Sequence, residues 1–245
     1  MTGGGAPPPD GTGDGDDPEP PRSTSSRTRA AVRRTYDRIA DHFAETRHHP
    51  WPEVREFLAD HAPGTEVGLD VGCGNGRHAG LLAEHADLVV GVDASRELLD
   101  AAVERLDERG DGDAFAPVAG DAARVPLRDD AADVGLYVAT VHHLPTRDGR
   151  LASLDELARV LRPGAPALLS AWSVTADRFD RDAAFDTTLP WTLPDGTAVQ
   201  RYYHVYDRDD FRAELRDSDL SVVSTRISSG NCYATIRAPD RDEGR

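Results

Sequence analysis

A glycine-rich turn, placed between a short apolar strand and a helix, constrains this chain more than any other feature. The segment Leu69-Asp70-Val71-Gly72-Cys73-Gly74-Asn75-Gly76 carries it. Glycines at such a turn let the backbone bend sharply and approach a ligand closely. The spacing is G-x-G-x-G, whereas dinucleotide-binding folds use G-x-G-x-x-G. Asp70, two residues before the first glycine, would repel a pyrophosphate, so the turn favours a cationic ligand.

Strand and helix patterns alternate from residue 65 onward, which is typical of βαβ units and a mostly parallel sheet. The predicted strands span 66–71, 88–92, 116–119, 133–139 and 165–172, and the helices between them span 77–85, 95–106 and 146–161. Ser95 is the expected N-cap of the second helix. A polar stretch at about 173–206 follows, and then come a helix at 208–215 and two strands at 220–227 and 232–236, which we expect to form a hairpin.

Two helical patterns precede the sheet, one beginning near residue 30 and one beginning at Pro52, with Pro50 and Pro52 breaking the first. Residues 1–28 are rich in Gly, Pro, Asp, Ser and Thr and are predicted to be disordered. The segment Arg22–Arg34 carries five arginines and no acid, and a solvated linker is favoured there over an RNA-binding arm. Residues 29–245 are predicted to form one domain, made of helices at 30–62, a ligand-binding half at 65–172, and an insertion with the final strands at 173–237.

Two further acids follow the second and third predicted strands. Asp93 lies about 20 residues beyond the glycines, where a carboxylate can accept both hydroxyls of a ribose, and Asp121 could accept the amino group of an adenine. S-adenosylmethionine carries an ammonium and a sulfonium but no phosphate, so it is the predicted cofactor. Cys73 is expected to pack in the turn, because no partner base is identifiable. The predicted cofactor site comprises Asp70, Gly72, Cys73, Gly74, Asn75, Gly76, Asp93, Ala94, Asp121, Ala122 and Val138.

The composition narrows the classes of partner. The formal net charge is -16, and all 28 basic residues are arginine. Such an acid excess argues against a generic polyanion binder and against a polybasic membrane anchor. No apolar run approaches the roughly 18 residues of a membrane span, and two cysteines cannot build a disulfide framework, so a cytoplasmic protein is expected. The acidic, lysine-free composition also suits a halophilic cytoplasm at molar salt, where charge is strongly screened.

The half of the chain at 65–172 resembles class I S-adenosylmethionine-dependent methyltransferases. Further segments resemble the tRNA wobble-uridine carboxymethyl methyltransferases, which esterify 5-carboxymethyluridine in the anticodon: Tyr36–Phe43, Thr46–Pro52, Val141–Pro145, Arg201–Tyr206 and Gly230–Tyr233. The resemblance implies an α/β fold with a Rossmann-like seven-stranded sheet and helices on both faces. Cys232 departs from the family, which usually has tryptophan there; this puts an aromatic stacking role at that position in doubt.

The implied reaction joins a carboxylate to a sulfonium and needs no general base, because the carboxylate is already ionised at neutral pH. The site therefore needs groups that position an anion and exclude water. The candidate catalytic residues are Arg47, His142, Arg201, His204 and Tyr202. Four aromatic residues could stack on or enclose the base: Tyr202, Tyr203, Trp172 and Trp51. If 201–206 is a strand, however, Arg201 and His204 face opposite sides and cannot both enter one pocket.

Blander interpretations accompany these residues. Arg47 could cap the first helix, Trp51 could pack the N-terminal helices onto the sheet, and one of His142 and His143 could be a core histidine. The spacing of His42, His48 and His49 supports no metal site. A small-molecule O- or C-methyltransferase and a non-catalytic cofactor-binding protein remain alternative functions.

The resemblance also implies partners: the tRNA anticodon loop, and a small zinc-binding activator protein that accompanies eukaryotic members. An unpaired edge strand near 88–92 or 116–119 is where such a protein would be expected to dock.

Overall fold

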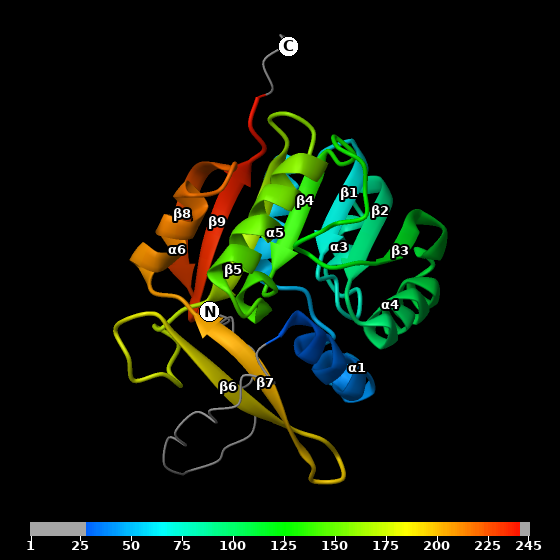
Figure 1. Cartoon of the computed structure of the whole chain (residues 1–245). Helices are drawn as coiled ribbons and strands as arrows, with labels where there is room; N and C mark the ends of the chain where they lie inside the picture. Colours follow the sequence, from blue (N-terminus) through cyan, green and yellow to red (C-terminus); the bar gives the residue numbers. More distant parts are fainter. Residues whose placement is uncertain (1–27, 241–245) are drawn as a thin grey trace, which may run out of the picture.

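A seven-stranded sheet lies at the centre of the computed structural model, which describes residues 28–240 (Figure 1). Its strand order is β3 (Phe115–Ala119), β2 (Ala86–Asp93), β1 (Thr65–Val71), β4 (Val134–Val138), β5 (Pro166–Trp172), β9 (Asn231–Arg237) and β8 (Ser221–Ser228). The first five strands are parallel, and β9 runs antiparallel to both of its neighbours. This confirms the predicted α/β class, the seven strands and the terminal hairpin.

Helices cover both faces of the sheet, because successive side chains of each strand point to opposite sides. Tyr137 of β4 packs on one face with α5 (Arg147–Val160) and α6 (Arg208–Arg216). Leu136 packs on the other face with α2 (Pro52–His61), the short α3 (Ala79–Leu82) and α4 (Arg96–Arg109). The central strands therefore bury side chains on both faces, each helix buries one apolar side, and the sheet separates the two cores.

Polar caps define where the crossover helices begin. The Ser95 side chain accepts a hydrogen bond from the backbone N–H of Leu98 at the start of α4, as predicted. Thr146 does the same for α5. Gly110 ends α4 in the left-handed conformation, and the single-turn helix η2 (Gly112–Ala114) follows before β3.

The N-terminal helix α1 (Arg29–Thr46) lies beyond the carboxyl ends of the strands (Figure 1). Asn75, in the glycine turn, fixes the end of this helix by donating a hydrogen bond from Nδ2 to the Arg47 carbonyl at 2.9 Å. Arg105 of α4 donates to the carbonyls of Ala44 and His48. These bonds satisfy carbonyl groups that a helix C-terminus leaves without partners, and they join α1 to the glycine turn and α4.

A separate two-stranded sheet occupies part of the stretch that the sequence marks only as polar. Its strands are β6 (Phe185–Thr192) and β7 (Ala198–Val205), paired antiparallel. Trp191 and Val199 pack against Ile39 of α1. The hairpin had escaped prediction because it packs on α1 and on loops, so its apolar residues follow no single face of the main core. Asp195 and Gly196, with Gly196 at φ +84°, supply the usual turn signal.

Two other expectations need correction. The helix predicted at 77–85 is a regular α-helix only over Ala79–Leu82, and tighter turns flank it, such as the bond from His85 N–H to the Leu82 carbonyl. The segment 88–92 is no sheet edge, because β2 pairs with both β1 and β3. Within the described residues, β3 and β8 are the two edges of the main sheet. Residues 1–27 of the tail predicted at 1–28 lie outside the described part of the chain.

Candidate active site

A cavity of about 550 Å³ lies between the carboxyl ends of the parallel strands and α1, and residues of β7 also line it. Its volume is in the usual range for small-molecule sites. The strand order reverses direction between β1 and β4, and such switch points are where open α/β sheets bind ligands. The topology therefore places a ligand site above the glycine turn.

The glycine turn is built so that its backbone can approach a ligand. Gly72 has φ +69°, and a Cβ there would lie 2.2 Å from the Thr140 side chain. Gly74 has φ +54° and, with Cys73 and Asn75, lines the cavity. Gly76 lies outside the cavity lining: a Cβ there would meet Leu106 of α4 at 2.7 Å. The third glycine thus allows close helix packing rather than ligand contact.

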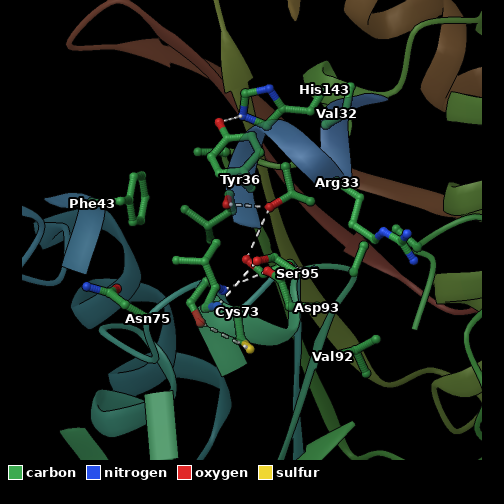
Figure 2. Close-up of a pocket in the computed structure, with 18 of the residues that line it drawn as sticks. Val32, Arg33, Tyr36, Phe43, Cys73, Asn75, Val92, Asp93, Ser95 and His143 are labelled. Carbon is green, nitrogen blue, oxygen red and sulfur yellow. Dashed lines mark hydrogen bonds between the residues drawn. The ribbon is translucent and has the colours of Figure 1, made fainter. Parts of the chain in front are cut away.

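Asp93 ends β2 with its carboxylate in the cavity wall. It accepts hydrogen bonds from Gly74 N–H at 2.9 Å and from Ser95 N–H at 2.8 Å, one to each oxygen (Figure 2). Burial raises its pKa, and these backbone donors act in the opposite direction. Each oxygen retains a second lone pair, so the carboxylate can both fix the turn and accept ribose hydroxyls.

Asp121 and Ala122, which follow β3, line one end of the cavity. Ala94, after β2, and Val138, at the end of β4, also line it, as predicted. One Asp121 oxygen accepts from Ala123 N–H at 2.9 Å, and the other lies 2.9 Å from the guanidinium of Arg29 in α1. This ion pair joins the first turn of α1 to the β3 loop.

Asp70 does not line the cavity, in contrast to the predicted direct contact. Its side chain is 1% exposed, and among the described residues its Oδ2 has no hydrogen-bond partner. Burial, and then the charge of Asp93, raise its pKa to about 7. Asp70 therefore lies behind the turn and lines no part of the cavity.

Stacked cations and rings form the wall of the cavity on the β5 and β7 side. Trp172 and Tyr203 are parallel, with ring centres 4.3 Å apart. The Arg201 guanidinium lies 5.4 Å from the Tyr203 ring centre and 4.5 Å from that of Trp191. Arg47 lies 5.1 Å from the same Trp191 ring. This cation–ring column fixes two guanidinium groups at one end of the cavity.

Two neighbouring histidines adopt defined neutral forms in the single-turn helix η3 (Val141–His143). His142 accepts from Trp172 N–H at Nδ1, 3.0 Å away, so its Nε2 carries the proton and can donate in the cavity. His143 donates from Nδ1 to the Tyr202 carbonyl and accepts at Nε2 from the Tyr36 hydroxyl, 2.8 Å away (Figure 2). Burial holds the pKa of His142 well below its usual value and lowers that of His143 to about 3.

The structure brings Arg47, His142 and Arg201 together at the cavity but leaves Tyr202 and His204 outside it. The reason is that β7 is a strand, whose alternation turns those two side chains to the other face. The Tyr202 hydroxyl donates to the Pro145 carbonyl. His204 lies 2.8 Å from Asp186 and 2.7 Å from Asp210. Both residues support the hairpin rather than lining the site.

Two tryptophans that were expected near the base, Trp51 and Trp172, do line the cavity. Cys232 does not: it is 1% exposed in the sheet core, paired with Ala171, and burial raises its thiol pKa to about 11. The departure from tryptophan at this position therefore removes no ring from the cavity of this protein.

Sequence reasoning missed several residues of the site, among them Tyr36 and Arg77 in the cavity lining and Trp191, whose ring supports Arg47 and Arg201. Arginines outnumber carboxylates in the cavity lining. The six arginines are Arg29, Arg33, Arg47, Arg77, Arg96 and Arg201, and the two carboxylates are Asp93 and Asp121. The cavity is therefore cationic in a chain of net charge -16. Three of these arginines, Arg29, Arg33 and Arg47, come from α1 and its C-cap, so the positive charges of the segment 29–47 held a signal for them.

Comparison with known proteins supports the same assignment. A family model described as a methyltransferase domain matches residues 69–169. A protein of Encephalitozoon cuniculi named as a methyltransferase is 32% identical over 84% of this chain and 94% of its own length. The tRNA (carboxymethyluridine(34)-5-O)-methyltransferase of Schizosaccharomyces pombe is 29% identical over 82% and 93%. That of Xenopus tropicalis is 40% identical over 61% of this chain, which spans only 22% of that protein.

Solved structures share the fold at low sequence identity. The 1,6-didemethyltoxoflavin-N1-methyltransferase of Burkholderia thailandensis, solved with S-adenosylhomocysteine, has a TM-score of 0.65 at 19% identity and covers 86% of this chain and 89% of its own. A complex of the Haloferax volcanii Trm112 methyltransferase activator with a methyltransferase has a TM-score of 0.62 at 18% identity, covering 87% and 100%.

The strand order, the glycine turn and the acids after β2 and β3 define a class I S-adenosylmethionine-dependent methyltransferase. The cavity fits that cofactor, because each Asp93 oxygen keeps a lone pair that can accept a ribose hydroxyl. Within this class, the chain belongs to the methyltransferase family that includes the Encephalitozoon cuniculi and Schizosaccharomyces pombe proteins. None of the helices in residues 28–240 has the length and apolarity needed to cross a bilayer.

Proposed function

We propose that this protein methylates the carboxylate of a carboxymethyl group on the wobble uridine of tRNA, forming a methyl ester. The relatives named for this reaction support the proposal, although the chain spans about a fifth to a half of the length of several of them. The observation that carries it is the cation–ring column of Arg47, Trp191, Arg201, Tyr203 and Trp172. It joins carboxylate-binding groups and base-stacking rings in one wall.

The reaction needs the acceptor oxygen in line with the methyl group, which the cofactor supplies as a sulfonium. Arg201 is fixed between two rings and offers a planar donor that matches a carboxylate. Neutral His142 offers an N–H without adding a charge. Because the attacking carboxylate and the sulfonium neutralise one another, a cavity that excludes water and holds both in place favours the transition state.

No residue in this proposal acts as a general base. The lowered pKa values of His142 and His143 keep both rings neutral around pH 7, and the Nδ1 atom of His142 is already engaged by Trp172 N–H. The proposal therefore assigns binding and orientation to the protein, and nucleophilicity to the acceptor carboxylate. A small-molecule acceptor is less favoured, because arginine and aromatic residues form the wall where an apolar lid would be expected.

We also propose a small activator protein as partner, with the β3 edge as its docking strand. Support comes from the exposed edge at Phe115–Ala119 and from the fold shared with a methyltransferase solved with Trm112. Activity and solubility should then rise on co-expression with such a protein. Equal activity of the isolated chain would count against this partner.

A cytoplasm at high salt is the proposed location, supported by the acidic, lysine-free composition. Thermal stability should therefore rise between low and molar KCl, and a protein most stable at low salt would contradict it.

The decisive experiment is nucleoside mass analysis of tRNA from a strain lacking the protein. Free 5-carboxymethyluridine should accumulate, and purified protein with labelled S-adenosylmethionine should methylate that tRNA. The Arg201→Gln variant should lose most of this transfer, whereas Arg55→Gln, exposed on α2 outside the cavity, serves as control. Unlabelled tRNA, despite tight binding of the cofactor by the protein, would refute the proposal.

A further inference from the structure

Arg77 directly follows the glycine turn and lines the cavity at the end of β1. Its guanidinium lies 5.2 Å from the centre of the Trp51 ring. Within residues 28–240, no carboxylate comes within ion-pair distance of it. A half-buried cation in a ligand cavity is therefore held by a ring contact, with its charge not neutralised by a direct salt bridge.

A second cation faces the same place. Burial and the neighbouring Arg47 lower the pKa of Arg77 to about 10, so the two guanidinium groups repel one another. Asn75, two positions before Arg77, holds the Arg47 backbone near the turn, because its side chain donates a hydrogen bond to the Arg47 carbonyl. Asp70 is the carboxylate that most offsets this repulsion, but it lies behind the turn and outside the cavity lining. An anion bound between the two arginines would relieve the repulsion.

The sheet order identifies that anion. Asp121 follows β3, Asp93 ends β2, and the glycine turn follows β1, so these groups lie in that order along the sheet edge. A ligand whose adenine and ribose lie at the first two places extends its amino-acid part past the turn. The sole anionic group of S-adenosylmethionine is the carboxylate of that part.

We infer that Arg77, with Arg47 as a second cation, binds the carboxylate of the cofactor, while Arg201 remains for the carboxylate of the acceptor. Two carboxylates must occupy one cavity in the proposed reaction, and separate cations keep them apart. The inference needs only the cofactor class, so it stands or falls independently of the RNA substrate.

Calorimetry with three ligands tests this assignment: S-adenosylhomocysteine, decarboxylated S-adenosylmethionine and 5′-methylthioadenosine, of which the last two lack the carboxylate. Arg77→Gln should weaken S-adenosylhomocysteine about 10- to 100-fold, as expected for a lost charge-assisted hydrogen bond. It should leave net-neutral 5′-methylthioadenosine within about twofold, and it should not weaken the doubly cationic decarboxylated S-adenosylmethionine. Arg77→Lys should recover part of the loss. Because 5′-methylthioadenosine reports an intact cavity, it also shows that the variant is folded.

Arg33→Gln is the matched control, because it removes one positive charge from the same cavity on α1. It should change the affinities of the two net-neutral ligands, S-adenosylhomocysteine and 5′-methylthioadenosine, by similar factors. Equal weakening of all three ligands by Arg77→Gln would overturn the inference in favour of a general structural effect. Unchanged S-adenosylhomocysteine affinity, with a raised KM for tRNA, would overturn it in favour of an acceptor site.

Discussion

His204 supports a quantitative prediction about how the substrate-side hairpin is held. Its ring joins three elements, since Nδ1 lies 2.8 Å from Asp186 of β6 and Nε2 lies 2.7 Å from Asp210 of α6. Only the protonated ring can donate to both carboxylates at once. The same strand carries Arg201 and Tyr203 into the cavity, so this bridge positions residues of the site through the backbone of β7.

The sign of the pH dependence follows from the charges around the ring. Burial and Arg150 of α5 lower the pKa of His204, while Asp186 and Asp210 raise it, and the net shift is upward. A raised folded-state pKa contributes stability that is fully present below the unfolded value, about 6.5. That stability is lost as the pH rises through the folded-state pKa.

His204→Asn should therefore cost about 2 kcal/mol near pH 6, since hydrogen bonds between charged groups contribute roughly 1.5–3 kcal/mol and this bridge is discounted because its carboxylates are about one-third exposed. For a domain of this size that corresponds to a Tm lower by about 4–8 °C. Thermal unfolding from pH 5.5 to 9 should show this difference shrinking as pH rises.

The control is His85→Asn, at a half-buried histidine with no carboxylate within ion-pair distance among the described residues. It should show no comparable pH-dependent difference. Asp210→Asn should reduce the pH dependence by removing one of the two acceptors. A His204→Asn difference that is constant, or that grows with pH, would refute the charged bridge.

Three further outcomes are expected. Gly72→Ala should weaken S-adenosylhomocysteine more than tenfold in calorimetry, because the new Cβ would lie 2.2 Å from Thr140 at φ +69°; unchanged affinity would contradict the close-approach role. Arg150→Met should cost about 3–5 kcal/mol in urea unfolding by leaving buried Glu214 without its cation, and adding Glu214→Gln should recover much of it; equal stability of both variants would refute this. Arg201→Gln should raise the KM for tRNA at least tenfold with unchanged cofactor affinity, and equal losses of both would place Arg201 at the cofactor instead.

The cofactor half was predictable from sequence because its information is local. A turn with positive φ at Gly72 and Gly74 requires glycine at those two positions, so it is visible in the sequence. Asp93 is visible in the same way, because it comes at the end of its strand. The N-cap of α4 at Ser95 is equally local. Asp70 was misplaced because its position before the turn says nothing about which side of the sheet it faces.

The substrate half was less predictable because tertiary packing decides it. Trp191 belongs to no regular apolar pattern in its own segment, and its partners Ile39 and Arg47 lie far away in the chain. Alternation along 201–206 did foresee that Arg201 and His204 would diverge, but not that His204 would meet Asp186 and Asp210. Contacts between distant segments produce no periodic pattern in the sequence from which they could be predicted.

The acid excess of the chain and the cationic wall of the cavity follow one electrostatic logic. In the proposed high-salt cytoplasm the Debye length falls to about 3 Å, so neither the charge of -16 nor a diffuse basic patch would act on RNA at a distance. Recognition must then come from groups in direct contact. Arg201, held between Trp191 and Tyr203, needs no long-range field to bind a carboxylate, and the stacked rings of Trp172 and Tyr203 bind through a face that salt does not screen. An acidic protein can therefore act on an anionic substrate when its few cations are fixed by aromatic rings inside a cavity.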